Sequence, residues 1–565
     1  MRREDRTRRE FLLNGGVVLS GLAAASQLRS QSSFPGTDSL GATAGLPTES
    51  QRLRGLMVDA ARVPESLDYY RRVIDFCAEW ELNALQFRIA DDQGSALRFS
   101  SAPDLLFHEH AFAPEELHEL AQYARSHGVD LIPELESFGH TGYITRSARY
   151  AHLLDADSHL SSEFTGVIPV HAETLELFKK LYAEISAVFP STFFHGGCDE
   201  VNWGGSSLSR KALEKKQRYE IWIEYLNSLN HVAESLGKQF IVWGDVVLRK
   251  EPRILEGLSK RIIVMDWNYV EESSAKVQET FSKVRANHSR GIGAPALINY
   301  RWGARAGASQ LANIDAFADA YLRAEDADSL GVILTNWVPS RYIQNSIWDG
   351  FAYAAVAFKE GTSVAKDSGF RRFVEKHYEA DWNDQWAEVF RLIYAAAPQV
   401  EHHASAGAVR LHVPWSTDDE LAAVLKNGSP QSFVFTRLRG LVEQLESHVS
   451  KNRADFQAFA LSVAYLDQLY WRETTVVEHV AKKSLARDDA ASLIKNIAER
   501  DHVLAEALSK DWDRGRFSDS AAKSKPLFGF QSKDQLVFQF QRAADYSASL
   551  AMEPARFFRL VSVPV

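Results

Sequence analysis

The segment STFFHGGCDE, residues 191–200, combines a short apolar stretch with a polar turn. Residues 191–194 are uncharged and β-prone, which predicts a buried strand. Two glycines follow, and glycine lets a backbone turn tightly or approach a ligand closely. The turn then presents Asp199 beside Glu200, and neighbouring residues of an extended chain point in different directions. The two carboxylates are therefore candidates for acting on one substrate from two sides, although a surface turn would also explain the segment by itself.

Short apolar strands alternate with amphipathic helices on both sides of this segment, from Leu53 to about Thr335. Residues 66–80, for example, carry apolar side chains at helical spacing. Eight strand–helix units within roughly 300 residues are typical of a (β/α)₈ barrel, which needs about 250. The sequence therefore predicts an α/β fold with a TIM barrel over residues 51–360. Its strands are expected at residues 53–59, 84–89, 130–136, 191–194, 240–243, 262–265, 296–298 and 332–334.

Polar and aromatic residues gather where the predicted strands end. The carboxyl ends of barrel strands share one edge, and active sites of such barrels are built there. Any single tryptophan at this edge would be explained as a core residue, but three at equivalent strand ends favour a sugar-binding site, because an indole offers a large apolar face with a polar handle. The residues expected at this edge are Asp91, His140, Glu200, Trp243, Trp267 and Trp337.

Beyond Gly361 the strand pattern stops and apolar stripes at helical spacing begin. One stripe runs within residues 438–445, another within 459–470 and a third within 493–508. We predict a mostly α-helical C-terminal domain over residues 361–565. It could pack on the barrel, mediate dimerisation or extend the substrate cleft, and the oligomeric state is left open.

The first residues resemble an export signal. Arg8 and Arg9 precede a short apolar run and three alanines at 23–25, which is the order of a twin-arginine signal. We therefore expect a signal peptide at residues 1–30, a linker at 31–50 and a periplasmic or secreted protein. A cytoplasmic helix with a basic end is the alternative. The apolar run is too short for a stable membrane span.

Composition excludes some classes of partner. The formal net charge is −10, so nucleic acid and anionic membrane surfaces would be repelled. The only cysteines are Cys77, in a helical pattern, and Cys198, in the glycine-rich turn. This pair does not support a disulfide framework, and we interpret Cys198 as a small buried side chain rather than a nucleophile or metal ligand.

Four motifs in barrel order resemble glycoside hydrolase family 20, the β-N-acetylhexosaminidases, in a style closest to the hexosaminidase D branch. They are RGLMVD at 54–59, DDQ at 91–93, GH at 139–140 and HGGCDE at 195–200. The likeness covers residues 52–358 and not the C-terminal part. It implies an exo-acting hydrolase of terminal β-linked GlcNAc or GalNAc, with an N-acetylhexosamine-containing glycan as substrate and with neither cofactor nor metal.

The resemblance also implies substrate-assisted retaining catalysis, in which the substrate's own 2-acetamido oxygen is the nucleophile and an oxazolinium ion is the intermediate. Glu200 would be the general acid. Asp199 would hold the acetamido N–H and offset the developing positive charge. We expect the Asp199 anion to raise the pKa of Glu200 and so keep its carboxyl protonated.

The same comparison implies further binding residues. Arg54 would grip sugar hydroxyls, and His140 with Asp91 or Asp92 would form a relay that supports Glu200. The remaining pocket residues are expected to be Trp243, Trp267 and Trp337 as walls, Asp245 as a lining residue, His195 as a brace, and Tyr300 as a donor to the acetamido carbonyl.

Two segments depart from the family's pattern. Tyr300-Arg301-Trp302 stands where Tyr-x-Asp is common, and Trp337-Val338-Pro339 where Trp-x-Glu is common. Contacts to the sugar's O4 and O6 should therefore differ. Three alternatives stay open: a catalytically impaired sugar-binding barrel, a glycosidase with an enzyme-borne nucleophile, and a metal site at His195, Asp199 and Glu200, which lacks a convincing ligand spacing.

Overall fold

Eight parallel strands close into a barrel, so the predicted (β/α)₈ architecture is confirmed. Each strand pairs with the next along the chain, and the first strand pairs with both the second and the last, which closes the ring. The barrel strands are β1 (Leu53–Asp59), β2 (Ala84–Asp91), β5 (Asp130–Leu135), β6 (Phe193–His195), β7 (Gln239–Trp243), β8 (Ile263–Trp267), β9 (Arg290–Ala294) and β11 (Ser329–Asn336).

The chain from Leu46 to Val565 forms one compact unit. Within it, the predicted domain boundary at residue 360 stays a prediction. The predicted signal peptide and linker fall before the first described residue. No helix in the described ranges is both long and apolar enough to cross a membrane. The computed structural model describes residues 52–155, 166–299, 305–323, 327–396, 414–427, 433–481, 487–517 and 536–562.

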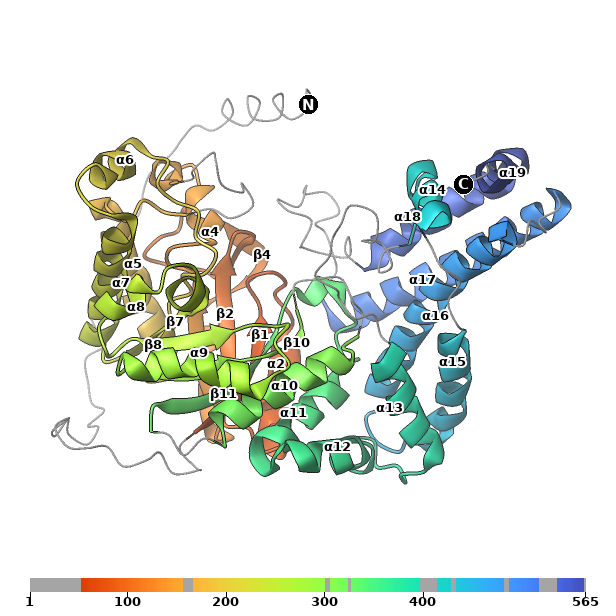
Figure 1. Ribbon diagram of the computed structural model, residues 1–565, viewed down its shortest axis with the longest axis horizontal. Coiled ribbons are helices and arrows are strands. Elements are labelled where there is room, and N and C mark those ends of the chain that lie inside the picture. Colours follow the sequence, from red (N-terminus) through yellow and green to blue (C-terminus); the bar gives the residue numbers. More distant parts are fainter. Residues whose placement is uncertain are drawn as a thin grey trace. The chain divides into compact units, whose positions relative to one another are not determined.

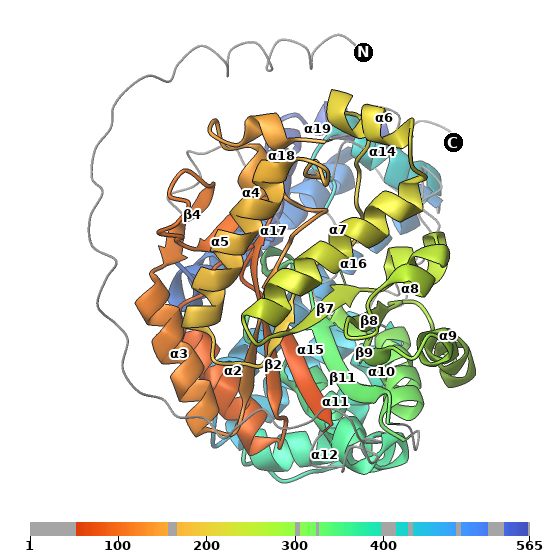
Figure 2. The ribbon, with the colours of Figure 1, turned by 90° about the vertical axis from the view of Figure 1, so that its left-hand side faces the viewer.

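Helices surround the strands (Figures 1 and 2). The helix predicted at 66–80 is α2 (Leu67–Glu79), whose first turn is capped because the Ser66 side chain accepts the Tyr69 N–H. Its apolar stripe is buried against the barrel, as the helical spacing predicted. The other helices of the barrel are α3 (Pro114–Ser126), α5 (Ala172–Val188), α7 (Arg218–Ser235), α8 (Arg253–Gly257), α9 (Ser274–Ala286), α10 (Ala308–Tyr321) and α11 (Trp348–Glu360).

The seventh barrel strand lies earlier in the chain than predicted. It is β9, whereas the predicted segment forms β10 (Ala296–Ile298), which pairs with β11 off the barrel ring. Gly291 and Gly293 have low β-propensity, which hid the strand. Close packing requires glycine here, because a Cβ on Gly293 would lie 2.7 Å from the Tyr321 ring.

Short extra elements follow the carboxyl ends of several barrel strands, at the edge where barrel active sites are built. Strands β3 and β4 follow β2, α4 follows β5, and α6 follows β6. A π-helical turn, η3, follows β7, and a 3₁₀ turn, η4, follows β11. Their bounds are β3 (Gly94–Leu97), β4 (Phe107–Phe112), α4 (Gly142–Thr145), α6 (Ser207–Leu213), η3 (Val246–Lys250) and η4 (Pro339–Arg341).

The described residues beyond α11 are helical and carry no strand, as the apolar stripes predicted. Leu438, Val442 and Leu445 are buried, and so are Phe459 and Val463. The helices are α12 (Thr362–His377), α13 (Asp384–Ala396), α14 (Asp418–Asn427), α15 (Val434–Leu445), α16 (Arg453–Ala481), α17 (Arg487–Gly515), α18 (Val537–Met552) and α19 (Pro554–Ser562).

A separate apolar cluster fills the barrel interior. Inward-facing side chains such as Met57 and Ile333 form it, and Trp243 and Trp337 belong to it at the carboxyl edge. The tryptophans are thus both core residues and part of the edge that carries the candidate site. The two cysteines, Cys77 and Cys198, are buried and not bonded to each other.

Candidate active site

The turn after β6 places both predicted catalytic acids at the carboxyl edge of the barrel. Gly197, Cys198 and Glu200 have φ of 66°, 74° and 46°, in the left-handed region that costs a non-glycine residue about 1–3 kcal/mol. Gly197 cannot be replaced, because a Cβ there would lie 2.0 Å from Glu136 Oε2. Glu136 instead accepts the Cys198 N–H at 3.1 Å. The turn is held by buried contacts and is not a surface turn.

A chain of hydrogen bonds runs from Glu200 into the protein. His140 Nε2 lies 3.2 Å from Glu200 Oε2 and 3.8 Å from Asp199 Oδ2. On the other side of the ring, His140 Nδ1 lies 2.9 Å from Asp92 Oδ2. Asp92 is fixed in turn because its Oδ1 accepts the Gly142 N–H at 2.9 Å. The relay residue is therefore Asp92 and not Asp91.

The pKa of Glu200 is shifted in the direction opposite to the one expected from the sequence. Burial alone would raise the pKa of Glu200, but the hydrogen bond and positive charge of His140, with Lys250 and Arg62, outweigh it and lower the pKa. Burial would lower the pKa of His140, yet Asp199, Asp92 and Glu200 raise it well above its ordinary value. The expected upward shift for Glu200 is wrong in this structure, because an imidazolium contacts the carboxylate.

Asp199 has one oxygen with no hydrogen bond from the described residues. Asp199 is 7% exposed, and its Oδ1 is buried and accepts no hydrogen bond from the described residues. Buried carboxylate oxygens normally accept hydrogen bonds, so this atom is suited to an N–H or O–H supplied by a ligand.

Asp245 supports the turn from the end of β7. Its Oδ2 accepts the Glu200 backbone N–H at 3.3 Å and a hydrogen bond from Lys250 Nζ at 2.9 Å. Burial raises the pKa of Asp245, as does the negative charge of Asp199, while Lys250 opposes both. The structure therefore brings Asp245 to the acids, as a support for the backbone of Glu200.

Aromatic rings form a wall beside the acids. The Trp243 and Trp337 rings lie 5.8 Å apart, and Trp267 stacks on Tyr269 with centroids 4.9 Å apart. Trp337 Nε1 donates to Tyr269 OH at 2.8 Å, so Tyr269 joins the predicted tryptophans into one wall. Burial raises the pKa of Tyr269 well above its ordinary value, with smaller contributions from the charges of Asp199 and Glu200. Tyr269 was not predicted as a site residue from the sequence, although its position two residues after the strand that ends at Trp267 indicated the same edge of the barrel.

Two arginines meet at the site, and neither is the predicted one. Arg88, fully buried on β2, bonds Asp91 at 2.8 Å and Asp59 at 3.2 Å. Arg62, after β1, pairs with the same two aspartates at 3.1 and 3.0 Å. Both guanidinium groups lie 5.2 Å from the centroid of the Trp337 ring.

The prediction for Arg54 is wrong. Arg54 is the second residue of β1, and its N–H donates to Asn83, which precedes β2. This is the amino edge of the barrel, opposite the acids. The motif RGLMVD does reach the site through its last residue, Asp59, because seven residues of β1 carry the chain across the barrel.

His195 is a buried brace in this structure. Its Nδ1 accepts the Gly197 N–H at 3.0 Å, and its ring lies 4.4 Å from that of Trp243. Burial, with the nearby Arg88 charge, lowers its pKa well below the ordinary value, so the ring is neutral. The side chains that group with the acids as potential metal ligands include His140 rather than His195. Tyr300, Arg301 and Trp302 are among the residues that the structure does not describe.

Comparisons with known proteins agree with this geometry. Residues 52–290 match the catalytic domain of glycosyl hydrolase family 20. The chain is 28% identical over 244 residues to the β-hexosaminidase subunit beta of Felis catus, covering 40% of this chain and 45% of that protein. It is 26% identical over 251 residues to a β-hexosaminidase of Vibrio furnissii, covering 38% and 40%. The chain spans about half the length of the curated relatives that it matches.

Solved structures are also similar. A crystal structure of a GH20 exo β-N-acetylglucosaminidase from Vibrio harveyi in complex with N-acetylglucosamine aligns with a TM-score of 0.44 and 21% identity, over 55% of this chain and 54% of that one. The match to the family's catalytic domain agrees with the resemblance seen in the four sequence motifs. The part of the chain that carries Asp199 and Glu200 is therefore similar to the catalytic domain of glycosyl hydrolase family 20.

Proposed function

We propose that this protein is a β-N-acetylhexosaminidase that removes terminal β-linked N-acetylhexosamine from a glycan, with the substrate's acetamido group as the nucleophile. One observation carries the proposal. Asp199 and Glu200 stand side by side at the barrel edge, with the His140–Asp92 relay behind Glu200. Relatives named β-hexosaminidase match the same part of the chain.

In the first step, Glu200 gives its proton to the glycosidic oxygen while the acetamido carbonyl oxygen attacks the anomeric carbon. The bond from that carbon to the leaving oxygen breaks, and its electron pair stays with the oxygen that receives the proton. Asp199 Oδ1 accepts the acetamido N–H and stabilises the positive charge of the oxazolinium ion that forms. The free acceptor on a buried carboxylate is the feature that supports this role.

In the second step, the Glu200 carboxylate removes a proton from water. The water oxygen attacks the anomeric carbon from the face that the leaving group occupied, and the oxazolinium ring opens to restore the acetamido group. Two inversions give net retention of configuration, and Glu200 regains its proton. No other nucleophile is required.

The proton for the first step is stored on the Glu200–His140 pair. The raised pKa of His140 and the lowered pKa of Glu200 place that proton on the imidazole before substrate binds. A sugar over Glu200 excludes water from the carboxylate, and desolvation disfavours its charged form. Binding would therefore move the shared proton across the 3.2 Å hydrogen bond to Glu200, where the leaving group needs it.

The aromatic wall gives the site its selectivity for a sugar ring. Trp337 and Tyr269 present apolar faces, and Trp337 Nε1 is already paired with Tyr269. The fully buried Trp243 lies behind them, with its Nε1 paired to Glu134 at 2.9 Å. A sugar can therefore dock on these faces without breaking a buried hydrogen bond. A small N-acetyl methyl group fits the same apolar environment.

The test is hydrolysis of 4-nitrophenyl N-acetyl-β-D-glucosaminide and the corresponding galactosaminide, with NMR detection of the first-formed anomer. We expect the β-anomer first and inhibition by a thiazoline that mimics the oxazolinium ion. Hydrolysis that is indifferent to the thiazoline would indicate an enzyme-borne nucleophile. Sugar binding without turnover would contradict the proposal as a whole.

We also propose export through the twin-arginine route, on the order of features at residues 1–30. Arg8→Lys with Arg9→Lys should retain the protein in the cytoplasm of a bacterial host, while the unchanged chain reaches the periplasm or medium. Equal distribution of the two proteins would contradict this part.

A further inference from the structure

The last turn of α17 brings an arginine from the C-terminal helices to the catalytic edge of the barrel. Arg516 continues that helix, since its N–H donates to Trp512 O at 2.9 Å. Its side chain is 3% exposed and reaches Glu65, whose side chain is equally buried. Arg516 Nε lies 2.9 and 3.0 Å from the two Glu65 oxygens. A residue more than 400 positions away along the chain is thus built into the loop after β1.

The same guanidinium also binds the loop after β11. Arg516 Nη2 donates to Pro339 O at 2.7 Å, and Nη1 to Tyr342 O at 3.4 Å. Gln344 of that loop donates to Glu65 Oε2 at 2.8 Å, which closes a second link between the two loops. Arg516 therefore joins β1 and β11 at the seam where the barrel closes.

These two loops carry the binding side of the candidate site. Arg62 lies three residues before Glu65, and Trp337 lies two residues before Pro339. The Arg62 guanidinium sits over the Trp337 ring, and the Val338 N–H donates to Asp59 at 3.1 Å with φ of 53° at Val338. A left-handed valine is strained and persists only where its surroundings hold it. Arg516 supplies part of that restraint from outside the barrel.

We propose that Arg516 is a positioning residue for the sugar pocket, through which the C-terminal helices hold the Arg62 and Trp337 loops in register. The expected effect on sugar binding rests on the proposed function. The expected effect on the two loops rests on the contacts of Arg516 alone. It assigns the C-terminal helices a role in shaping the site. Phe517 adds to the same junction by stacking on His110 of β4, with ring centroids 4.3 Å apart.

An arginine is required because three groups must be bound at once. The planar fork of a guanidinium can bond a carboxylate and two carbonyls in fixed directions, whereas a lysine ammonium is a single point charge on a flexible stem. Arg516→Lys keeps the charge near buried Glu65 and so avoids leaving that carboxylate unpaired. The variant should fold, yet lose the link to Pro339 and Tyr342.

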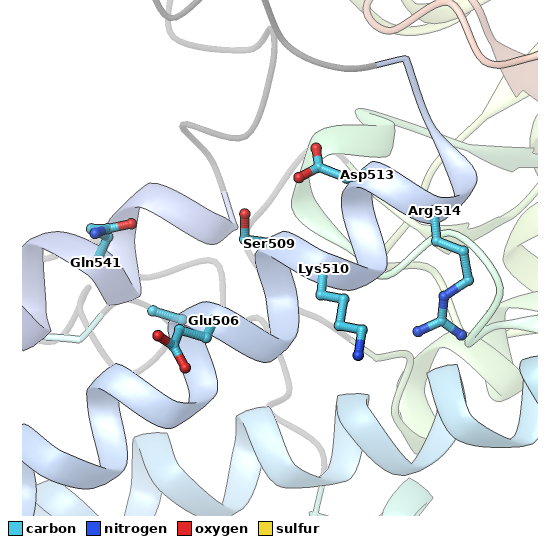
Figure 3. Close-up of a pocket in the computed structure, with 7 residues that line it drawn as sticks. Glu506, Ser509, Lys510, Asp513, Arg514 and Gln541 are labelled. Carbon is cyan, nitrogen blue, oxygen red and sulfur yellow. The ribbon is translucent and has the colours of Figure 1, made fainter.

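The end of α17 also offers matched controls. Figure 3 shows an open hollow on α17 and α18, with Lys510 and Arg514 extending from one side of α17 and Asp513 from the other. Arg514 is exposed, so Arg514→Lys changes the same residue type two positions from Arg516 without touching the barrel loops. Arg500→Lys weakens a half-buried pairing of α17 with Asp467 and Gln468 of α16.

The experiment has two readouts on the full chain. In hydrogen–deuterium exchange, peptides covering residues 60–66 and 337–346 should exchange roughly tenfold faster in Arg516→Lys than in the wild type. Their exchange rates should be unchanged in both controls. In kinetics, KM for the nitrophenyl glycoside and Ki for the thiazoline should rise roughly tenfold with kcat within about threefold and the pH profile unmoved.

The first readout needs no activity, so the two proposals fail separately. A wild-type protein that neither binds nor hydrolyses N-acetylhexosaminides would overturn the proposed function, while faster loop exchange in Arg516→Lys would still support the positioning role. Loop exchange equal to that of Arg500→Lys, or KM and Ki unchanged in Arg516→Lys, would overturn the positioning role. Glu65→Gln tests the partner side, and its effect should not add to that of Arg516→Lys.

Discussion

The two sides of the candidate site are held in place by different parts of the chain. On the acid side, Asp199 and Glu200 are braced by residues of the barrel, through His140, Asp245 and the Glu136 contact with the turn. On the binding side, the loops after β1 and β11 are joined by Arg516 from a helix far beyond the barrel in sequence. The acid side is a hydrogen-bonded chain centred on His140, and the binding side is a set of buried ion pairs that join two loops.

The residues on the two sides should therefore affect different kinetic steps. Groups that exchange a proton or stabilise a charge act mainly in the transition state, so their loss lowers kcat. Groups that hold a sugar-binding wall act on ground state and transition state alike, so their loss raises KM. Substitutions on the two sides should therefore give opposite kinetic signatures.

Glu200→Gln should have the largest effect. We expect kcat to fall about 10²- to 10⁴-fold, because the general acid is lost while a hydrogen-bonding side chain remains. The loss should be greater for a GlcNAc-β-1,4-GlcNAc disaccharide than for a nitrophenyl glycoside, whose leaving group needs little protonation. Initial rates on both substrates check this, and an equal loss on the two would show that Glu200 does not protonate the leaving group.

Asp199→Asn should follow, with kcat lower by about 10²- to 10³-fold. The amide keeps the shape but cannot offset the positive charge of the oxazolinium ion. Thiazoline affinity should fall in parallel with kcat, whereas affinity for the product sugar should change little. Inhibition constants measured for both compounds give the answer, and a parallel loss of product affinity would assign Asp199 to ground-state binding instead.

His140→Gln should change the pH dependence. In the wild type the shared proton leaves only as the pH rises through the raised pKa of His140. Without the imidazole, the proton resides on Glu200 and leaves at the carboxyl's own lower pKa. The alkaline limb of kcat/KM should therefore move to lower pH by about one unit or more.

The control for that experiment is Asp92→Asn, which keeps the ring and should shift the limb less in the same direction, because Asp92 is one of the groups that raise the pKa of His140. A shift of the limb to higher pH in His140→Gln would mean that His140 only depresses the pKa of Glu200 and stores no proton.

The smallest effect is expected on the binding side. Arg62→Lys should raise KM roughly tenfold with kcat nearly unchanged, because a lysine cannot pair with Asp59 and Asp91 while facing Trp337. Arg54→Lys, at the opposite edge of the barrel, should leave KM and kcat as they are. Michaelis–Menten measurements on the two variants show which arginine contacts the sugar. A larger change in KM for Arg54→Lys than for Arg62→Lys would assign that contact to Arg54.

Local sequence patterns were enough to predict the barrel and several residues of the candidate site. Alternation of apolar strands and amphipathic helices predicted the barrel, because those periods depend on residues close together in the chain. Asp199 and Glu200 could be named as a pair since they are covalent neighbours beside two glycines. His140, Trp243, Trp267 and Trp337 could be placed at one edge because they follow strands.

Other parts depended on contacts that no local pattern records. The seventh strand was missed where Gly291 and Gly293 make room for aromatic rings of surrounding helices. Arg54 was preferred because it opens a family-like motif, yet the length of β1 puts it at the wrong end.

The sequence by itself therefore determined the barrel architecture, the edge that carries the polar and aromatic residues, and the adjacent pair of acids. Only the tertiary structure decided that Asp92 rather than Asp91 contacts His140, that Arg62 and Tyr269 lie at the aromatic wall, and that Arg516 joins the loops after β1 and β11. The physical reason is that periodicity and covalent adjacency depend on residues close together in the chain. The pairing of buried charges and the pKa of Glu200 depend instead on groups that the fold brings together from distant parts of the chain.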